Sequence, residues 1–182
     1  RAAGHELGRF EEQCDAYVIN TCSVTNMADR KSRQMIHRAR KKNPQAIVVA
    51  AGCYVQTSTE EVMEDLAVDI VIGNNQKNHL VDCIAEFENK NHPICAENAE
   101  QGAQARNTEE RVVDCIDINK DEQEYEYFLV NKTAEHTRAF IKVQDGCNQF
   151  CSYCIIPYAR GRVRSRSIDN VLAEVKRLAQ NG

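Results

Sequence analysis

The chain has 182 residues, of which 42% are hydrophobic and 27% are charged, and its formal net charge is -4. No apolar run approaches the roughly 18 to 20 residues that a membrane span requires, and the N-terminal segment RAAGHELGRFEEQC has no apolar signal-peptide region. We therefore expect a cytoplasmic protein with no membrane partner, long enough for one domain or one and a half. Because the sequence opens on Arg1 rather than on Met, we also expect a fragment or a processed product.

The first 88 residues predict an open parallel α/β sheet. Short apolar runs rich in β-branched residues are typical of buried parallel strands, and they occur at residues 15–20, 45–52 and 67–74. Helical patterns alternate with these runs, at residues 27–43, 57–66 and 76–87. The second helix begins with Ser58 and Glu61 at the spacing of a capping box. The order β-α-β-α-β-α predicts the sheet.

The pattern changes after residue 88. A candidate strand, RVVDCIDI, lies in a stretch that is otherwise polar and aperiodic. Residues 137–146 predict a strand that leads into a cysteine cluster, and a helix is expected from residue 168 to residue 180 with Ser167 as its N-cap. A strand, a loop and a helix form the first βα unit of a larger domain. The expected organisation is a domain at residues 1–88, a connection at 89–136 and the start of a second domain at 137–182.

Charge is segregated along the chain. Residues 28–42 hold seven Lys and Arg against one acid, and residues 158–166 hold four Arg and no acid. Residues 82–127 carry thirteen acids against four bases. The two basic segments are compatible with a polyanionic partner such as nucleic acid, although a run of charge also forms an ordinary solvated face.

Nine cysteines, in a chain without a secretion signal, favour metal or redox chemistry over a disulfide framework. Three of them, Cys147, Cys151 and Cys154, are spaced as C-x3-C-x2-C. A structural zinc site usually has four ligands, a bacterial ferredoxin motif has another spacing, and a redox disulfide pair leaves Cys147 unexplained. Three thiolates fit best a 4Fe-4S cluster that keeps one iron open for another molecule.

The stretch CNQFCSYC resembles the CxxxCxΦC signature of radical S-adenosylmethionine enzymes, with Tyr153 at the aromatic position. The resemblance implies that residues 137–182 begin a TIM-like barrel. It also implies that Cys147, Cys151 and Cys154 hold a 4Fe-4S cluster whose free iron binds S-adenosylmethionine. Tyr153 is expected either beside the adenine of that cofactor or as a core aromatic under the loop.

A second resemblance concerns VINTCSVTN around Cys22 and AAGCYVQ around Cys53, which are similar to the N-terminal domain of the methylthiotransferases. Both cysteines follow consecutive strand candidates, at the edge where open α/β sheets bind ligands. The resemblance implies that they hold an auxiliary 4Fe-4S cluster, whose third ligand belongs to a Gly-Cys-x-x-Asn motif that this sequence lacks. Cys14 lies at the opposite end of the first strand and is not assigned. No catalytic residue is assigned beyond the cluster ligands.

Within that family, NTCSVTN, GCYVQ and CIIPYARGRVRSRS most resemble the branch that methylthiolates C2 of N6-threonylcarbamoyladenosine beside the tRNA anticodon. The implied partners are a tRNA anticodon stem-loop and an electron donor of the flavodoxin or ferredoxin type. The alternative substrates are isopentenyladenosine in tRNA and a ribosomal protein. Candidate phosphate contacts, which an ordinary solvated loop would also explain, are Arg160, Arg162, Arg164 and Arg166. Because the family's later barrel strands and RNA-binding domain are missing, we expect these 182 residues to be inactive alone.

The remaining cysteines have simpler interpretations. Cys83 lies in an apolar helical segment and Cys115 in the candidate strand, where buried thiols pack as small hydrophobic groups. Cys95 has no readable role. Two rival functions stay open: a zinc or iron-sulfur module that binds RNA without catalysis, and a thiol-disulfide oxidoreductase that uses Cys151 and Cys154.

Overall fold

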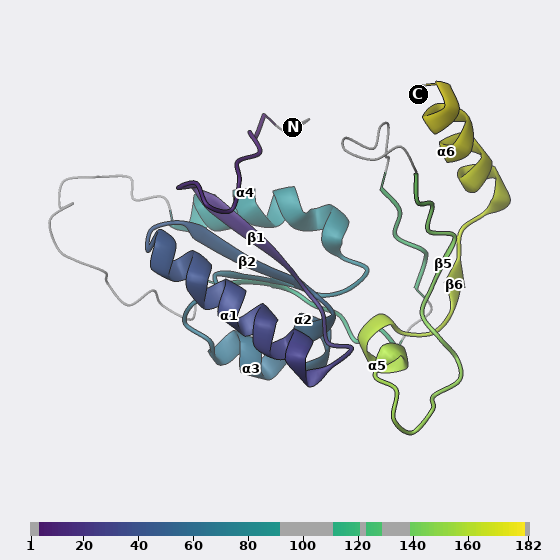
Figure 1. Ribbon diagram of the computed structural model, residues 1–182, viewed down its shortest axis with the longest axis horizontal. Helices are drawn as coiled ribbons and strands as arrows, with labels where there is room; N and C mark the ends of the chain where they lie inside the picture. The colour runs from purple at the N-terminus through teal and green to yellow at the C-terminus, as the bar shows by residue number, and fades with distance from the viewer. Residues whose placement is uncertain (1–3, 92–110, 121–122, 129–138, 181–182) are drawn as a thin grey trace, which may run out of the picture. The chain divides into compact units, whose positions relative to one another are not determined.

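The computed structural model describes residues 4–91, 111–120, 123–128 and 139–180 (Figure 1). The chain forms two compact units, Arg1–Ile116 and Asp117–Gly182, which are taken separately below. Most of the expected connection at 89–136, including Cys95, lies outside the described residues. Within the described segments, no helix is both long enough and apolar enough to cross a membrane.

The first unit contains a parallel sheet in the order β1-β2-β3-β4, which confirms the α/β fold class. Its strands are β1 (Ala16–Thr21), β2 (Ile47–Gly52), β3 (Ile70–Ile72) and β4 (Val112–Asp114). The first three coincide with the apolar runs of the sequence. The candidate strand RVVDCIDI supplies the fourth, which pairs with β3.

Helices cover both faces of this sheet (Figure 1). They are α1 (Asn26–Lys42), α2 (Cys53–Thr57), α3 (Thr59–Glu64) and α4 (Leu80–Asn91), the last preceded by a 3-10 turn at Lys77–His79. Because successive side chains of a strand point to opposite faces, Val48 of β2 packs in a core with α1, α2 and α3. Its neighbour Val49 packs in a second core with α4.

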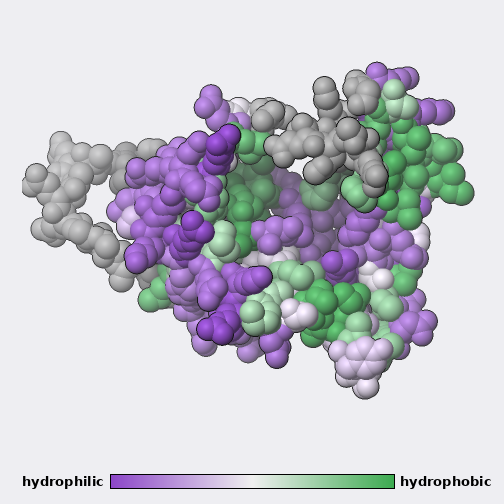
Figure 2. Space-filling model, in the orientation of Figure 1, coloured by the Kyte–Doolittle hydropathy of each residue, from purple (hydrophilic) through white to green (hydrophobic). Residues whose placement is uncertain are grey.

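The pattern of α1 follows its sequence closely. Thr25 caps its first turn by accepting a hydrogen bond from the backbone N–H of Ala28 at 3.2 Å, and Ile36 and Ala39 are buried against the sheet. The outer face of the helix is hydrophilic (Figure 2), and it carries exposed basic side chains such as Arg38 and Lys41. Several basic side chains of residues 28–42 therefore lie on a solvated helix face, whereas Arg40 is largely buried in an ion pair with Asp69.

The predicted helix at 57–66 is wrong in its bounds, because two short helices meet at Ser58. The backbone N–H of Ser58 donates to the carbonyl of Tyr54 and ends α2, while its own carbonyl accepts from Val62 and begins α3. The Ser58 side chain makes no capping hydrogen bond. Glu61 forms an ion pair with Arg33 at 2.8 Å instead of closing a capping box.

The second unit contains β5 (Gln144–Asp145), α5 (Ile156–Arg160), β6 (Arg164–Ser165) and α6 (Ile168–Gln180). Helix α6 has the predicted bounds, and Ser167 accepts a hydrogen bond from the backbone N–H of Asn170 at 3.3 Å. The described part of the predicted strand at 137–146, residues 139–146, is regular over β5 alone, which pairs antiparallel with β6. In the described part of that segment Phe140 and Val143 are 86% and 51% exposed, so burial does not stabilise extended backbone there.

Candidate functional site: two sets of cysteine thiols

The first set of thiols lies at the carboxyl edge of the parallel sheet. Cys22 directly follows β1 and Cys53 directly follows β2. Thr21 and Gly52, the residues before them, are paired across the two strands, so both cysteines leave the sheet from matching positions. Cys22 is exposed and Cys53 is 7% exposed. The sequence predicted this juxtaposition from the strand ends alone.

Gly52 shapes the backbone at this edge. Its φ of +112° lies in the left-handed region that side chains disfavour. A Cβ at this position would lie 2.6 Å from the carbonyl oxygen of Thr21 and 3.0 Å from Oδ1 of Asn20. Only glycine allows this close approach, and the turn that results brings Cys53 to the start of α2.

Cys22 is held by the helix that follows it. Its backbone N–H donates to Oγ of Ser32 at 3.3 Å, and Ser32 in turn donates to the carbonyl of Ala28 at 2.9 Å. Ser23, the next residue, exchanges a hydrogen bond with Thr57 of α2 at 3.0 Å. These contacts fix the loop after β1 against α1 and α2, although the Cys22 side chain itself stays open to solvent.

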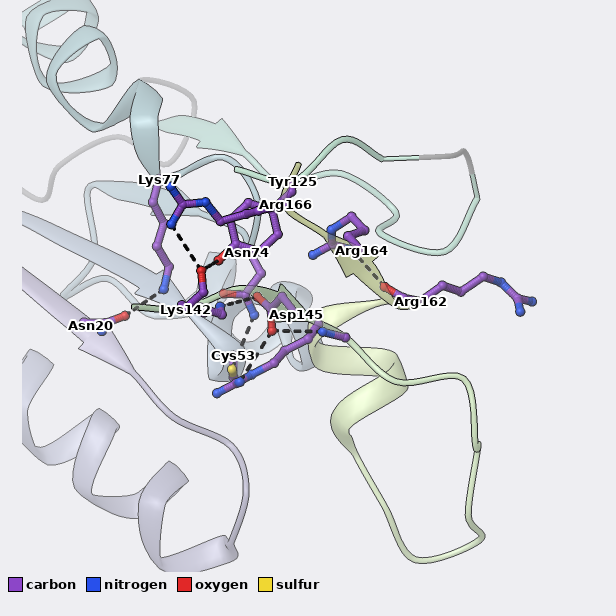
Figure 3. Close-up of polar contacts among 12 residues, drawn as sticks. Asn20, Cys53, Asn74, Lys77, Tyr125, Lys142, Asp145, Arg162, Arg164 and Arg166 are labelled. Carbon is purple, nitrogen blue, oxygen red and sulfur yellow. Dashed lines mark hydrogen bonds and ion pairs between the residues drawn. The ribbon is translucent and has the colours of Figure 1, made fainter. Parts of the chain in front are cut away.

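Two further side chains at the same edge were not predicted as part of a site. Asn74, which follows β3, donates from Nδ2 to the sulfur of Cys53 at 3.3 Å (Figure 3). Lys77 donates to Oδ1 of Asn20 at 3.0 Å. The signal that could have found them is their position just beyond a strand end, which also supported Cys22 and Cys53 after the resemblance had pointed to them.

The other cysteines of this unit are placed as packing or peripheral groups. Cys83 is buried in the second core, where desolvation raises the pKa of its thiol to about 11. Cys115 follows β4, half-buried and 3.5 Å from Oγ1 of Thr59, and burial raises its pKa. Cys14 packs beside the first core at the amino end of β1, away from the carboxyl edge.

The second set of thiols lies on the loop after β5. Gly146 has a φ of +79°, and a Cβ there would overlap the backbone of Arg162. Cys147 donates its backbone N–H to the carbonyl of Gly161 at 3.0 Å, and Cys154 donates to the carbonyl of Cys151 at 2.9 Å. The first bond ties the start of the loop to the residue after α5, and the second closes a turn within the loop.

Side-chain exposure on this loop bears on the expected roles. Cys151 is exposed, whereas Cys147 and Cys154 are half-buried. Tyr153 is 90% exposed, so the described structure does not make it a core aromatic. Its position beside a bound adenine stays a prediction.

The donor chemistry of both sets fits iron-sulfur ligation. All the cysteines in the described residues are free thiols, and thiolate is the ligand that iron-sulfur clusters use. Among these residues, no three Cys, His, Asp or Glu side chains are already arranged as a metal site. The three loop cysteines nevertheless lie within eight residues of each other, and Cys22 and Cys53 lie at one edge of a rigid sheet.

The four candidate phosphate contacts have different surroundings. Arg166 forms an ion pair with Glu174 in which both side chains are only 5% exposed. Its guanidinium lies over the rings of Tyr127 and of Tyr125, the second of which is labelled beside Arg166 in Figure 3. Arg164 is buried as well. Both arginines are thus occupied within the unit, which the charge pattern could not show.

The two remaining arginines are more accessible. Arg160 lies 3.5 Å from Asp145. Burial raises the pKa of Asp145, but the hydrogen bond and charge of Lys142, with help from Gly146 and Arg160, outweigh it and lower the pKa overall. Arg162 is exposed, with its guanidinium over the ring of Phe150. Of the four, Arg162 is best placed for an external anion.

Comparisons with known proteins match both sets of cysteines. Residues 1–73 match the family described as "Uncharacterized protein family UPF0004", and residues 141–182 match the radical SAM superfamily. The radical SAM match implies a 4Fe-4S cluster and S-adenosylmethionine as cofactors.

Curated relatives align with nearly the whole chain. The threonylcarbamoyladenosine tRNA methylthiotransferase MtaB of Aquifex aeolicus is 42% identical over 98% of this chain and 39% of its own length. The protein of the same name from Bacillus subtilis is 37% identical over 100% of this chain and 36% of its own length. The tRNA-2-methylthio-N(6)-dimethylallyladenosine synthase of Bacteroides fragilis is 30% identical over 99% of this chain and 36% of its own length. The chain thus spans well under half the length of these relatives, and over the residues that it shares with them it is similar to radical SAM methylthiotransferases.

Proposed function

We propose that the protein containing this sequence methylthiolates tRNA, at C2 of N6-threonylcarbamoyladenosine next to the anticodon. The observation that carries the proposal is the presence of two separate thiol sets in one chain: Cys22 and Cys53 at a sheet edge, and the C-x3-C-x2-C loop. A simple radical enzyme needs only the second set. A reaction that inserts sulfur as well as activating carbon gives the first set a purpose.

In this proposal Cys147, Cys151 and Cys154 hold the 4Fe-4S cluster that binds S-adenosylmethionine, and Cys22 and Cys53 are ligands of a second 4Fe-4S cluster. When bound, these groups supply the one-electron chemistry that activates an unreactive C–H bond, and the sulfur and methyl group that replace the hydrogen. The chain itself positions them. Gly52 and Gly146 allow the close backbone approaches that direct the two cysteine-bearing turns.

The tRNA contact is assigned to the exposed arginine of the second unit. Arg162 can pair with a backbone phosphate, whereas Arg164 and Arg166 hold the fold of their own unit. The target base must leave its stack to be modified, as bases do for other enzymes that act on them. The electron donor would be a flavodoxin or ferredoxin type of protein, and the site of action the cytoplasm.

The preference for threonylcarbamoyladenosine rests on the relatives. Two relatives named for that substrate are 42% and 37% identical to the chain, whereas those named for the dimethylallyl nucleoside are 28% to 34% identical. The dimethylallyladenosine reaction is the second candidate, because its relatives align over the same residues and would use the same thiols.

Nucleoside mass spectrometry of tRNA tests the proposal. Deletion of the gene should abolish 2-methylthio-threonylcarbamoyladenosine and leave the unmethylthiolated nucleoside in its place. The full-length gene should restore the product, its Cys53→Ala variant should not, and a Cys14→Ala variant should restore it because Cys14 lies away from the carboxyl edge. Loss of the dimethylallyl product alone would establish the second candidate, and no change in either would overturn the proposal.

A further inference from the structure

A buried hydrogen bond joins Asn74 to Cys53 (Figure 3). The distance between Nδ2 and Sγ is 3.3 Å, and the two residues are 8% and 7% exposed. A buried amide is costly unless its polar atoms find partners, so placing one against a sulfur atom requires an explanation. A cysteine used only for packing would be served as well by an apolar neighbour.

The position of Asn74 is set without help from Cys53. The backbone N–H of Gly73 donates to the carbonyl of Asp114 at 2.8 Å, and that of Asn74 donates to Oε1 of Gln56 at 2.9 Å. Gln56 also donates to the carbonyl of Ile116 at 2.7 Å. The turn after β3 is therefore held between α2 and the chain beyond β4, and the Asn74 amide is already in place beside the sulfur.

The direction of the bond agrees with a sulfur that carries negative charge. A thiolate bound to iron has no proton and can only accept hydrogen bonds, so a partner must present N–H or O–H. The amide group of Asn74 presents N–H. Hydrogen bonds to cluster sulfurs stabilise the reduced and more negative state, which raises the reduction potential.

We propose that Asn74 is a positioning residue for the auxiliary iron-sulfur cluster: it orients the Cys53 thiolate and raises the reduction potential of the cluster through an N–H···S hydrogen bond. This inference rests on the proposed role of Cys53 as a cluster ligand. It adds a residue from a third strand end, that of β3, to the two that carry Cys22 and Cys53.

The test uses full-length protein in which Cys147, Cys151 and Cys154 are replaced by alanine, so that any remaining iron belongs to the auxiliary site. In this background Asn74→Leu removes the donor at similar volume, and Asn74→Ala removes it with a smaller side chain. Two quantities are measured: the rate at which a chelator extracts iron, and the midpoint potential of the cluster. Both variants should bind iron about tenfold more weakly than the parent, the usual effect of losing an outer-shell partner, and should therefore release it faster. Both should also have a lower midpoint potential.

Asn20→Leu is the matched control. Asn20 is an asparagine at the end of the neighbouring strand, but its side chain bonds to Lys77 rather than to a cysteine, so its loss should leave the potential unchanged. If Asn74→Leu fails to fold by circular dichroism, Asn74→Ala decides. Unchanged iron release and potential in a folded Asn74 variant would overturn the inference. Full iron retention in Cys53→Ala would instead overturn the ligand role, so the two failures are distinguishable.

Discussion

Replacing Gly52 with alanine should destabilise the first unit and displace Cys53. The residue has a φ of +112°, and holding a side chain at such a dihedral costs about 1 to 3 kcal/mol. The new Cβ would also lie 2.6 Å from the carbonyl oxygen of Thr21, a backbone atom held by the pairing of β1 with β2. Relieving such an overlap typically costs a further 1 to 3 kcal/mol or so, giving about 2 to 6 kcal/mol in total.

Thermal unfolding of the metal-free protein, followed by circular dichroism, measures this loss. For a chain of this size each kcal/mol lowers the midpoint by about 2 to 4 °C, so Gly52→Ala should lower it by at least about 4 °C. Gly73→Ala is the matched comparison at the same sheet edge. The backbone of Gly73 is not in the left-handed region, so the dihedral cost is absent there, although the new Cβ would lie 2.6 Å from Oε1 of Gln56 and 2.9 Å from Sγ of Cys115. A midpoint for Gly52→Ala equal to that of the parent or of Gly73→Ala would refute the reasoning.

Three other predictions concern single groups. Alkylation of Cys83 by iodoacetamide should be slow at pH 8 and should accelerate up to about pH 11. Burial raises the pKa of this thiol to about 11, and only the thiolate reacts. Mass spectrometry of the labelled peptide measures the rate at each pH. Arg166→Ala should destabilise the second unit by about 3 to 5 kcal/mol in urea unfolding, because it leaves the Glu174 carboxylate buried without its partner, whereas Arg166→Met with Glu174→Leu should cost less. Arg162→Ala should leave the stability of the protein unchanged but weaken its binding to tRNA. In filter-binding titrations at several salt concentrations, the number of counterions released on tRNA binding should fall by about one. Unchanged binding would show that this arginine does not contact tRNA.

Much of the first unit could be predicted from its sequence because burial on both faces requires continuous apolar strands. The runs at 15–20, 45–52 and 67–74 correspond to β1, β2 and β3, and parallel pairing then brings Cys22 and Cys53 to one edge. That inference needs only strand direction and register.

The features that could not be predicted depend on tertiary contacts. The break at Ser58 arises from backbone bonds to Tyr54 and Val62, which the helical periodicity of 57–66 does not reveal. Asn74 has no motif of its own, and its contact with the sulfur of Cys53 depends on the register of β3 beside β2. The burial of Arg166 depends on Glu174, eight residues later, so a basic run that could bind phosphate proves to be partly structural.

Iron and sulfide analysis of the anaerobically purified full-length protein tests the central claim most directly. If each of the two thiol sets holds a 4Fe-4S cluster, the protein contains about eight irons per chain. The triple variant Cys147→Ala, Cys151→Ala and Cys154→Ala should then retain about four irons. The Cys14→Ala variant should retain the full content. One zinc and no iron would contradict the account, as would iron content that is indifferent to these cysteines.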